Sequence, residues 1–260
     1  MRKTALNYQD FEGNAILACL TGDEKALALQ HGELVDFKLH QNVYQPDQRI
    51  KDAYFPLGAI LSIVARMKDG SAIEIGTIGR EGTSAIPLIM GSETTANESF
   101  CQVPGLAWKM PATTFRRLLG QSQTFREFLN RYLQAYLNML GQLAACNRLH
   151  SVYERCARWL LMTQDRVGGD KFPLTHEFLA IMLGSRRSGV TIAAETLKRA
   201  GLIDYEHGWI TILNRGGLQA ATCECYEITA AQFGDLLSVR PATKESSSRS
   251  RNRNVSALER

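Results

Sequence analysis

Residues 173–217 decide the fold, and they read PLTHEFLAIMLGSRRSGVTIAAETLKRAGLIDYEHGWITILNRGG. Thr175 is a typical N-cap residue, and the apolar spacing that follows it predicts a short helix over residues 176–182. Gly184 can adopt the left-handed conformation that ends a helix. A second helix is predicted over residues 186–199, with its valine, alanine and leucine side chains facing inward.

A β-hairpin is expected after these helices, because residues 202–205 and 209–213 have strand character and are joined through residues 206–208. Two helices, a tight turn and a hairpin together form a winged helix-turn-helix. The start of the second helix is polar and basic: Arg186, Arg187, Ser188 and Thr191. In the major groove an arginine can bind both acceptors of a guanine, so the motif favours DNA binding over an ordinary solvated face.

The segment before this motif predicts one long amphipathic helix. Residues 121–150 contain no proline, and large apolar residues recur every three or four positions from Phe125 to Leu143. A helix of about 28 residues spans about 40 Å, which is longer than the face of a small β-domain. We therefore favour a coiled-coil-like dimer seam along this helix. The alternative is that the apolar stripe packs against the chain's own sheet.

Short apolar runs separated by turn signals occupy residues 33–110, which indicates an antiparallel β-roll of the jelly-roll type. The strongest hairpin signal is Asp69-Gly70. The predicted class is α+β, with four parts. These are a β-roll sensor domain with flanking helices (1–120), a dimerisation helix (121–150), a winged helix-turn-helix domain (151–240) and a disordered basic tail (241–260).

Three groups of residues carry a family resemblance: IGREG at 78–82, RCARWLL at 155–161, and LTHE at 174–177 followed by LGSRR at 183–187. Through them the chain resembles the Crp/Fnr superfamily of bacterial transcription regulators over nearly its whole length. The resemblance implies a cyclic-nucleotide-binding-type β-roll, a dimerising helix and a reader of palindromic promoter sites. It also allows RNA polymerase as a partner beside double-stranded DNA.

The resemblance assigns roles to individual residues. Arg187 corresponds to the family's guanine-reading arginine, and Thr175 and His176 correspond to its phosphate-contacting pair. Ser188 stands where the family often has glutamate, so the operator half-site is expected to differ from the common one. The full set of expected DNA-binding residues is Thr175, His176, Arg186, Arg187, Ser188, Thr191 and His207.

The effector is less defined. Gly79, Glu81 and Gly82 are the candidate effector-binding residues, although Glu81 could equally stabilise its own turn. Cyclic-nucleotide binders of the family place a basic residue in the phosphate cassette, but residues 91–99 contain none and include Glu93 and Glu98. Cyclic AMP is therefore not expected to bind. An iron–sulfur cluster is not expected either, because Cys19 is the only cysteine in the first hundred residues.

The remaining features suggest no other chemistry. The net charge is +4, there is no signal-peptide pattern and no spanning apolar run, so we expect a cytoplasmic protein without membrane contact. Cys223 and Cys225, with Cys156, could form half of a metal or redox site, but free thiols and no metal are expected. Three histidines are expected to be isolated: His150, His176 and His207. Three aromatic residues are expected in the core of the roll: Phe100, Trp108 and Phe115.

No sequence signature of an enzyme is present, since the nucleophile elbow, phosphate-binding loop and dinucleotide fingerprint are all missing. A cupin-like enzyme would also need clustered histidine and glutamate ligands. The main rival to a DNA-binding regulator is a ligand-binding or protein-interaction module whose DNA-binding domain is degenerate. Retention on promoter DNA separates these two classes.

Overall fold

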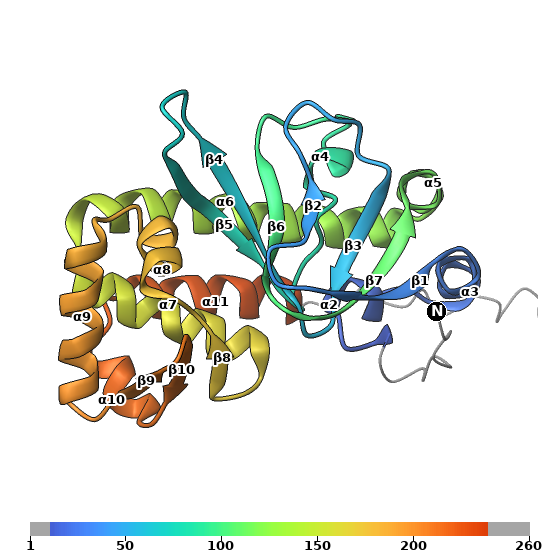
Figure 1. Ribbon diagram of the computed structural model, residues 1–260. Helices are drawn as coiled ribbons and strands as arrows, with labels where there is room; N and C mark the ends of the chain where they lie inside the picture. Colours follow the sequence, from blue (N-terminus) through green and yellow to red (C-terminus); the bar gives the residue numbers. More distant parts are fainter. Residues whose placement is uncertain (1–10, 239–260) are drawn as a thin grey trace, which may run out of the picture.

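The computed structural model describes residues 11–238 and has the predicted α+β organisation, with a β-roll, one long helix and a winged helix-turn-helix domain (Figure 1). Two antiparallel sheets form the roll. The first has the order β1 (Glu33–Phe37), β7 (Gly105–Pro111), β3 (Asp52–Pro56). The second has the order β2 (Asn42–Tyr44), β6 (Glu98–Val103), β4 (Ile60–Arg66), β5 (Ala72–Ile78).

Short helices flank the roll: α2 (Ala15–Ala18), α3 (Gly22–His31), α4 (Ile86–Ile89) and α5 (Ala112–Gln121). The predicted hairpin turn joins β4 to β5, where Gly70 has a φ of 85° and the Met67 N–H donates to the Ser71 carbonyl at 2.8 Å. Trp108 and Phe115 lie in the core of the roll as expected.

Strand β4 is buried on both faces, which explains its uninterrupted apolar run. Leu61 and Ile63 pack into the core of the roll, whereas Ile60 and Val64 belong to the core of the DNA-binding domain. Phe100 also lies on this outer side, where its ring centroid is 6.0 Å from that of Phe178, so its assignment to the roll core was wrong. The four-stranded sheet therefore serves two cores, and the domains share an apolar boundary.

The long helix α6 (Gln123–Leu149) begins after Ser122, whose Oγ accepts a hydrogen bond from the Phe125 N–H at 3.0 Å. Most of its apolar stripe is buried against the chain's own roll: Phe125, Phe128, Leu129, Tyr132, Tyr136 and Met139. The expectation that the whole stripe faces a second chain is corrected accordingly. Helix α6 lies along the roll (Figure 1), so its apolar stripe forms part of the core of the roll.

The roll does not cover two further faces of α6. Helix α11 (Cys225–Ser238), which the sequence did not indicate, packs along α6. The third face is open and carries Leu137, Gly141, Ala144 and Ala145. Leu137 is 51% exposed.

The winged helix-turn-helix domain, for which the sequence predicts DNA binding, comprises α7 (Val152–Val167), β8 (Lys171–Pro173), α8 (His176–Leu183), α9 (Arg187–Arg199), β9 (Ile203–Glu206), β10 (Trp209–Ile212) and α10 (Arg215–Ala220). Its sheet has the order β8-β10-β9, and neither β8 nor α10 was predicted. The tail expected at residues 241–260 lies outside the described residues. Within residues 11–238 no helix combines the length and hydrophobicity needed to cross a membrane.

Candidate nucleic-acid interface

The helix-turn-helix is formed by α8, a tight turn and α9. The Thr175 hydroxyl caps α8 by accepting a hydrogen bond from the Phe178 N–H at 3.1 Å. Gly184 ends α8 in the left-handed conformation, with a φ of 53°. A Cβ atom at Gly184 would also come within 2.4 Å of Ile73 Cδ1 on β5, so glycine is required both by the backbone and by the contact with the roll.

Helix α9 separates a small, buried face from an open basic end. Its inward residues are Val190, Ala193, Ala194 and Leu197. At the other face Arg186 is the N-cap residue and Arg187 the first helical residue, and both are exposed with Ser188. Within the part of the chain that the structure describes, neither guanidinium group has a hydrogen-bond or ion-pair partner. Two guanidinium groups are therefore available to an anionic ligand.

Ile192 also lies on the outward face of α9, and its side chain is 63% exposed. The sequence analysis missed it. The signal was present, because Ile192 follows Ser188 by four positions on the face opposite the buried valine and alanine residues. An exposed apolar side chain on this face is suited to the methyl group of thymine.

His176 is not isolated, contrary to the sequence interpretation. Its ring stacks on Tyr205 with centroids 4.3 Å apart, and its Nδ1 lies 3.2 Å from the Thr191 hydroxyl. Burial and the nearby Arg187 lower the pKa of His176, so the imidazole is neutral at neutral pH. His176 thus connects α8, α9 and the wing, and its Nε2 is buried without a hydrogen-bond partner among the described residues.

The wing is the β9–β10 hairpin. His207 and Gly208 form its turn with φ values of 50° and 80°, which suits the twist of a tight hairpin. The His207 side chain is exposed at the tip, 3.4 Å from the Glu206 carboxylate. Lys171 on β8 lies 5.7 Å from the ring centroid of Trp209. The wing therefore presents a histidine, and the neighbouring strand β8 places a lysine beside the exposed Trp209.

The candidate effector residues are occupied within the chain. The Glu81 carboxylate accepts hydrogen bonds from the Gly79 N–H at 3.1 Å and from Arg166 Nε at 2.8 Å. A Cβ atom at Gly82 would lie 2.4 Å from the Tyr132 hydroxyl, so α6 fills the space beside this turn. Of the two roles considered for Glu81, the structure displays the stabilising one, and it extends to α7 of the DNA-binding domain.

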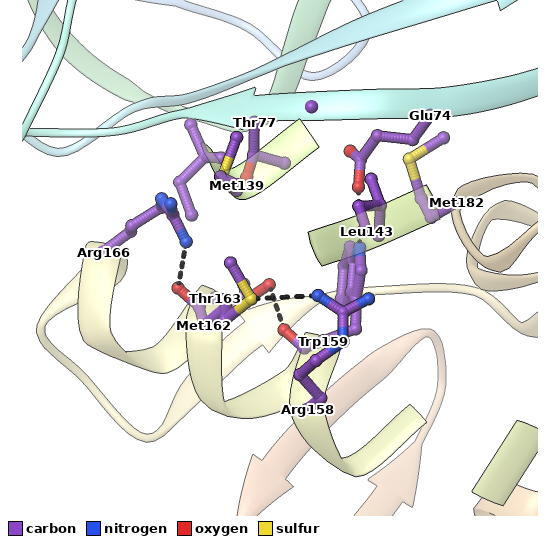
Figure 2. A pocket seen from close by; sticks show the side chains of 12 residues that line it. Glu74, Thr77, Met139, Leu143, Arg158, Trp159, Met162, Thr163, Arg166 and Met182 are labelled. Carbon is purple, nitrogen blue, oxygen red and sulfur yellow. Dashed lines mark hydrogen bonds between the residues drawn. The ribbon is translucent and has the colours of Figure 1, made fainter. Parts of the chain in front are cut away.

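A pocket lies between β5, α6, α7 and α8, at the boundary of the two domains (Figure 2). Glu74 extends into it from β5, accepting hydrogen bonds from Trp159 Nε1 at 3.0 Å and from the Ser62 hydroxyl at 2.7 Å. Burial raises the pKa of Glu74 to about 7, although these hydrogen bonds oppose the shift. Arg158 and Arg166 also line the pocket. Glu74 could not be identified from the sequence, because β5 has the pattern of an ordinary alternating strand.

The acidic residues of the 91–99 segment have partners. Glu93 forms ion pairs with Arg49 at 2.9 Å and Arg116 at 2.8 Å, and Glu98 forms one with Arg66 at 2.5 Å. Arginines therefore do lie beside this segment, but carboxylates of the chain already neutralise them.

The cysteine arrangement differs from the one considered in the sequence. Cys223 and Cys225 lie beside Cys146 and His150, whereas Cys156 is buried in the core of the DNA-binding domain. His150 is therefore not isolated either. Its ligand-type atoms and those of the three cysteines all lie within 4.8 Å of one another.

Comparisons with known proteins agree with this architecture. Residues 154–221 match the family of Crp-like helix-turn-helix domains. No curated protein sequence gives a significant match. Among solved structures, a transcriptional regulator of the Crp/Fnr family from Eubacterium rectale aligns with a TM-score of 0.63 and 18% identity, over 81% of this chain and 98% of the regulator.

Two further structures align in the same way. FixK2 from Bradyrhizobium japonicum gives a TM-score of 0.63 at 14% identity, over 74% of this chain and 98% of FixK2. A CRP-family transcriptional regulator from Thermus thermophilus gives 0.61 at 15% identity, over 72% and 95%. At these identities the likeness concerns the fold. The chain thus carries a Crp-like helix-turn-helix domain at residues 154–221 and shares the overall fold of the Crp/Fnr regulators.

Proposed function

We propose that the chain is a homodimeric, sequence-specific DNA-binding transcription regulator rather than an enzyme, and that it acts in the cytoplasm. The observation that carries this proposal is the exposed pair Arg186 and Arg187, unpartnered within residues 11–238, at the start of a helix whose opposite face is buried. A helix N-terminus with free guanidinium groups attracts phosphate and can reach guanine in the major groove. RNA polymerase is a further expected partner.

The proposed contacts divide into base reading and backbone positioning. Arg187 pairs with guanine, while Ser188, Thr191 and Ile192 contact neighbouring base edges. Thr175, His176, Arg186 and His207 contact phosphates on either side of the groove. The stacking of His176 on Tyr205 supports this division, because it holds the phosphate-contacting histidine at a fixed position beside α9.

The proposed dimer forms through the open face of α6. Leu137, Gly141 and Ala144 are spaced by four and three residues, the repeat that lets two helices pack along a seam. Small residues at two of these positions allow the helices to approach closely. A two-fold dimer places two α9 helices about one turn of DNA apart, so the operator is an inverted repeat with half-site centres about 34 Å apart.

Leu137→Glu tests this seam. We expect a monomer by sedimentation, because a carboxylate without a partner is costly in a desolvated seam. Leu106→Glu is the matched control, since Leu106 is 41% exposed on β7. A wild-type monomer at micromolar concentration contradicts the proposed dimer.

The signal is proposed to act at the β-roll and not to be cyclic AMP. Glu93 already binds Arg49 and Arg116, Glu98 binds Arg66, and Tyr132 fills the space beside Gly82. Calorimetry is expected to detect no cyclic-nucleotide binding at micromolar concentration.

Selection of bound DNA from a random library tests the function as a whole. We expect wild-type protein to enrich an inverted repeat, and Arg187→Ala to lose the preference at one base pair of each half-site. Arg199→Ala, at the far end of the same helix, is the matched control and should enrich the same repeat. Retention of DNA without any sequence enrichment would support the rival class, a ligand-binding or protein-interaction module with a degenerate DNA-binding domain.

A further inference from the structure

The cysteines beside α11 form a cluster that the proposed DNA-binding function does not use. Cys146 lies in the last turn of α6 and His150 is the residue that ends this helix. Cys223 and Cys225 stand before and at the start of α11. The three cysteines are buried and His150 is half-buried.

The distances in this cluster match those around one tetrahedral ion. Cys146 Sγ lies 3.6 Å from Cys223 Sγ, and Cys225 Sγ lies 3.5 Å from His150 Nδ1. Metal–sulfur bonds of about 2.3 Å and metal–nitrogen bonds of about 2.0–2.1 Å place tetrahedral ligand atoms about 3.8 Å and about 3.6 Å apart. We propose that Cys146, His150, Cys223 and Cys225 bind a single zinc-type divalent ion.

The surroundings of His150 support metal binding. Its Nε2 lies 3.2 Å from the Glu224 carboxylate, which leaves Nδ1 to face the cysteines. A histidine that ligates a metal through one nitrogen usually donates its other N–H to a carboxylate or carbonyl, which fixes the tautomer and orients the ring. Glu224 is therefore a positioning residue. Gln142 adds a similar contact, since its Nε2 donates to Cys225 Sγ at 3.1 Å.

The charge of the site is also balanced. Three thiolates and a divalent cation leave one net negative charge in a largely buried place. Arg155 and Arg158 on α7 both interact electrostatically with Cys146. Nε of each guanidinium is buried without a hydrogen-bond partner among the described residues. A negatively charged metal site would compensate the cost of burying these arginines.

A mononuclear site explains the cluster better than the two other forms of cysteine chemistry. A disulfide between Cys146 and Cys223 would leave Cys225 and the oriented His150 without a role. An iron–sulfur cluster distributes its cysteine ligands over several iron atoms, whereas these four ligand atoms lie within 4.8 Å of one another. Four protein ligands also complete a tetrahedral shell, which is typical of structural rather than catalytic zinc.

The position of the site indicates what the ion does. Residue 151 caps α7, so the ion would bind at the junction between α6 and the DNA-binding domain. It would also hold the start of α11 against α6 (Figure 1). Metal binding would thereby fix the C-terminal helix and stabilise the connection between α6 and α7.

Metal analysis of the full-length protein, purified under reducing and anaerobic conditions, tests this proposal without depending on DNA binding. We expect one zinc per chain in wild-type protein and in Cys19→Ser, a control cysteine outside the cluster. Cys223→Ser should lose at least ten-fold in zinc content. Glu224→Gln should keep the ligands but weaken zinc affinity about 10–100-fold.

Cobalt titration of the metal-free wild-type protein gives a second readout that does not rely on variants folding. We expect the visible absorption of a tetrahedral cobalt–thiolate site, saturating at one ion per chain. Three results would overturn the proposal: no metal and no cobalt spectrum, a Cys146–Cys223 disulfide in peptide mass spectra, or stoichiometric iron with acid-labile sulfide.

Discussion

Arginine has opposite surroundings in two regions of this molecule. On α9, Arg186 and Arg187 are exposed and, within residues 11–238, have no partner. At the boundary between the roll and α7, Arg158 and Arg166 are buried, and Arg166 is held by Glu81. Burying a guanidinium group is costly unless a counter-charge compensates it, whereas an exposed guanidinium group can remain unpaired until it binds a ligand. Arg166 therefore connects the two domains, while Arg186 and Arg187 are free to bind outside the molecule.

The largest expected effect comes from breaking the buried pair. Glu81→Ala removes the carboxylate from Arg166 and leaves a charge in a desolvated place, which should lower the free energy of unfolding by about 3–5 kcal/mol. Urea denaturation with unchanged m-value measures this loss. Glu33→Ala is the control, because the Glu33–Lys109 pair is exposed and should contribute at most about 1 kcal/mol. Equal losses in both variants would remove the distinction between buried and exposed pairs.

Glu74 shares the pocket with these buried arginines, and its protonation is expected to have the next-largest effect on stability. Because burial raises its folded-state pKa from 4.5 to about 7, the folded protein holds a proton that the unfolded chain has lost. Stability is therefore highest below pH 4.5 for this group and falls as pH rises through about 7. The total loss is about 3 kcal/mol, since one pKa unit corresponds to about 1.4 kcal/mol.

Glu74→Gln should remove this pH dependence, because an amide can still accept the Trp159 N–H and does not ionise. Urea denaturation at pH 5 and pH 8 compares the two proteins. Wild type should lose stability over this interval relative to the variant, and the variant should be the more stable protein at pH 8. A parallel pH dependence of both proteins would show that Glu74 is ionised throughout.

The DNA-binding side of the comparison was largely predictable from sequence. Thr175, Gly184 and the small residues of α9 are local signals, because caps, turns and helical spacing depend on neighbours in the chain. The hairpin at His207 was visible for the same reason. Even here Ile192 was missed, since an apolar residue on a helix is read first as core.

The buried contacts between residues far apart in the sequence could not be predicted in the same way. Glu81 and Arg166 are 85 positions apart, and so are Glu74 and Trp159. Cys146 and Cys223 are separated by 77 positions. No local pattern connects such residues, because the fold alone brings them together. The stripe of α6 was misassigned for a related reason: periodicity reveals an apolar face but not whether a sheet of the same chain or a second chain covers it.

Removing the Arg187 side chain from α9 is expected to have a smaller effect, on the free energy of DNA binding. Arg187→Ala should weaken binding to the selected operator by about 1–3 kcal/mol per half-site and relax the preference at one base pair. Fluorescence anisotropy with operators changed at single base pairs measures both quantities. Arg199→Ala should change neither. Wild-type affinity and selectivity in Arg187→Ala would refute the assignment of Arg187 as the guanine-reading residue.

The smallest expected effect is on the salt dependence of DNA binding. It distinguishes the charged Arg186 from the neutral His176 within the same interface. Arg186→Ala should weaken binding to all sequences alike and reduce the magnitude of the slope of log K against log salt by about 0.9 per subunit, because one phosphate contact is lost. His176→Asn should weaken binding without changing that slope, because burial and Arg187 lower the pKa of His176 and keep its imidazole neutral at neutral pH. Anisotropy titrations across a range of salt concentrations measure both slopes. A reduced slope in His176→Asn would mean that DNA protonates this histidine, whereas an unchanged slope in Arg186→Ala would remove Arg186 from the phosphate contacts.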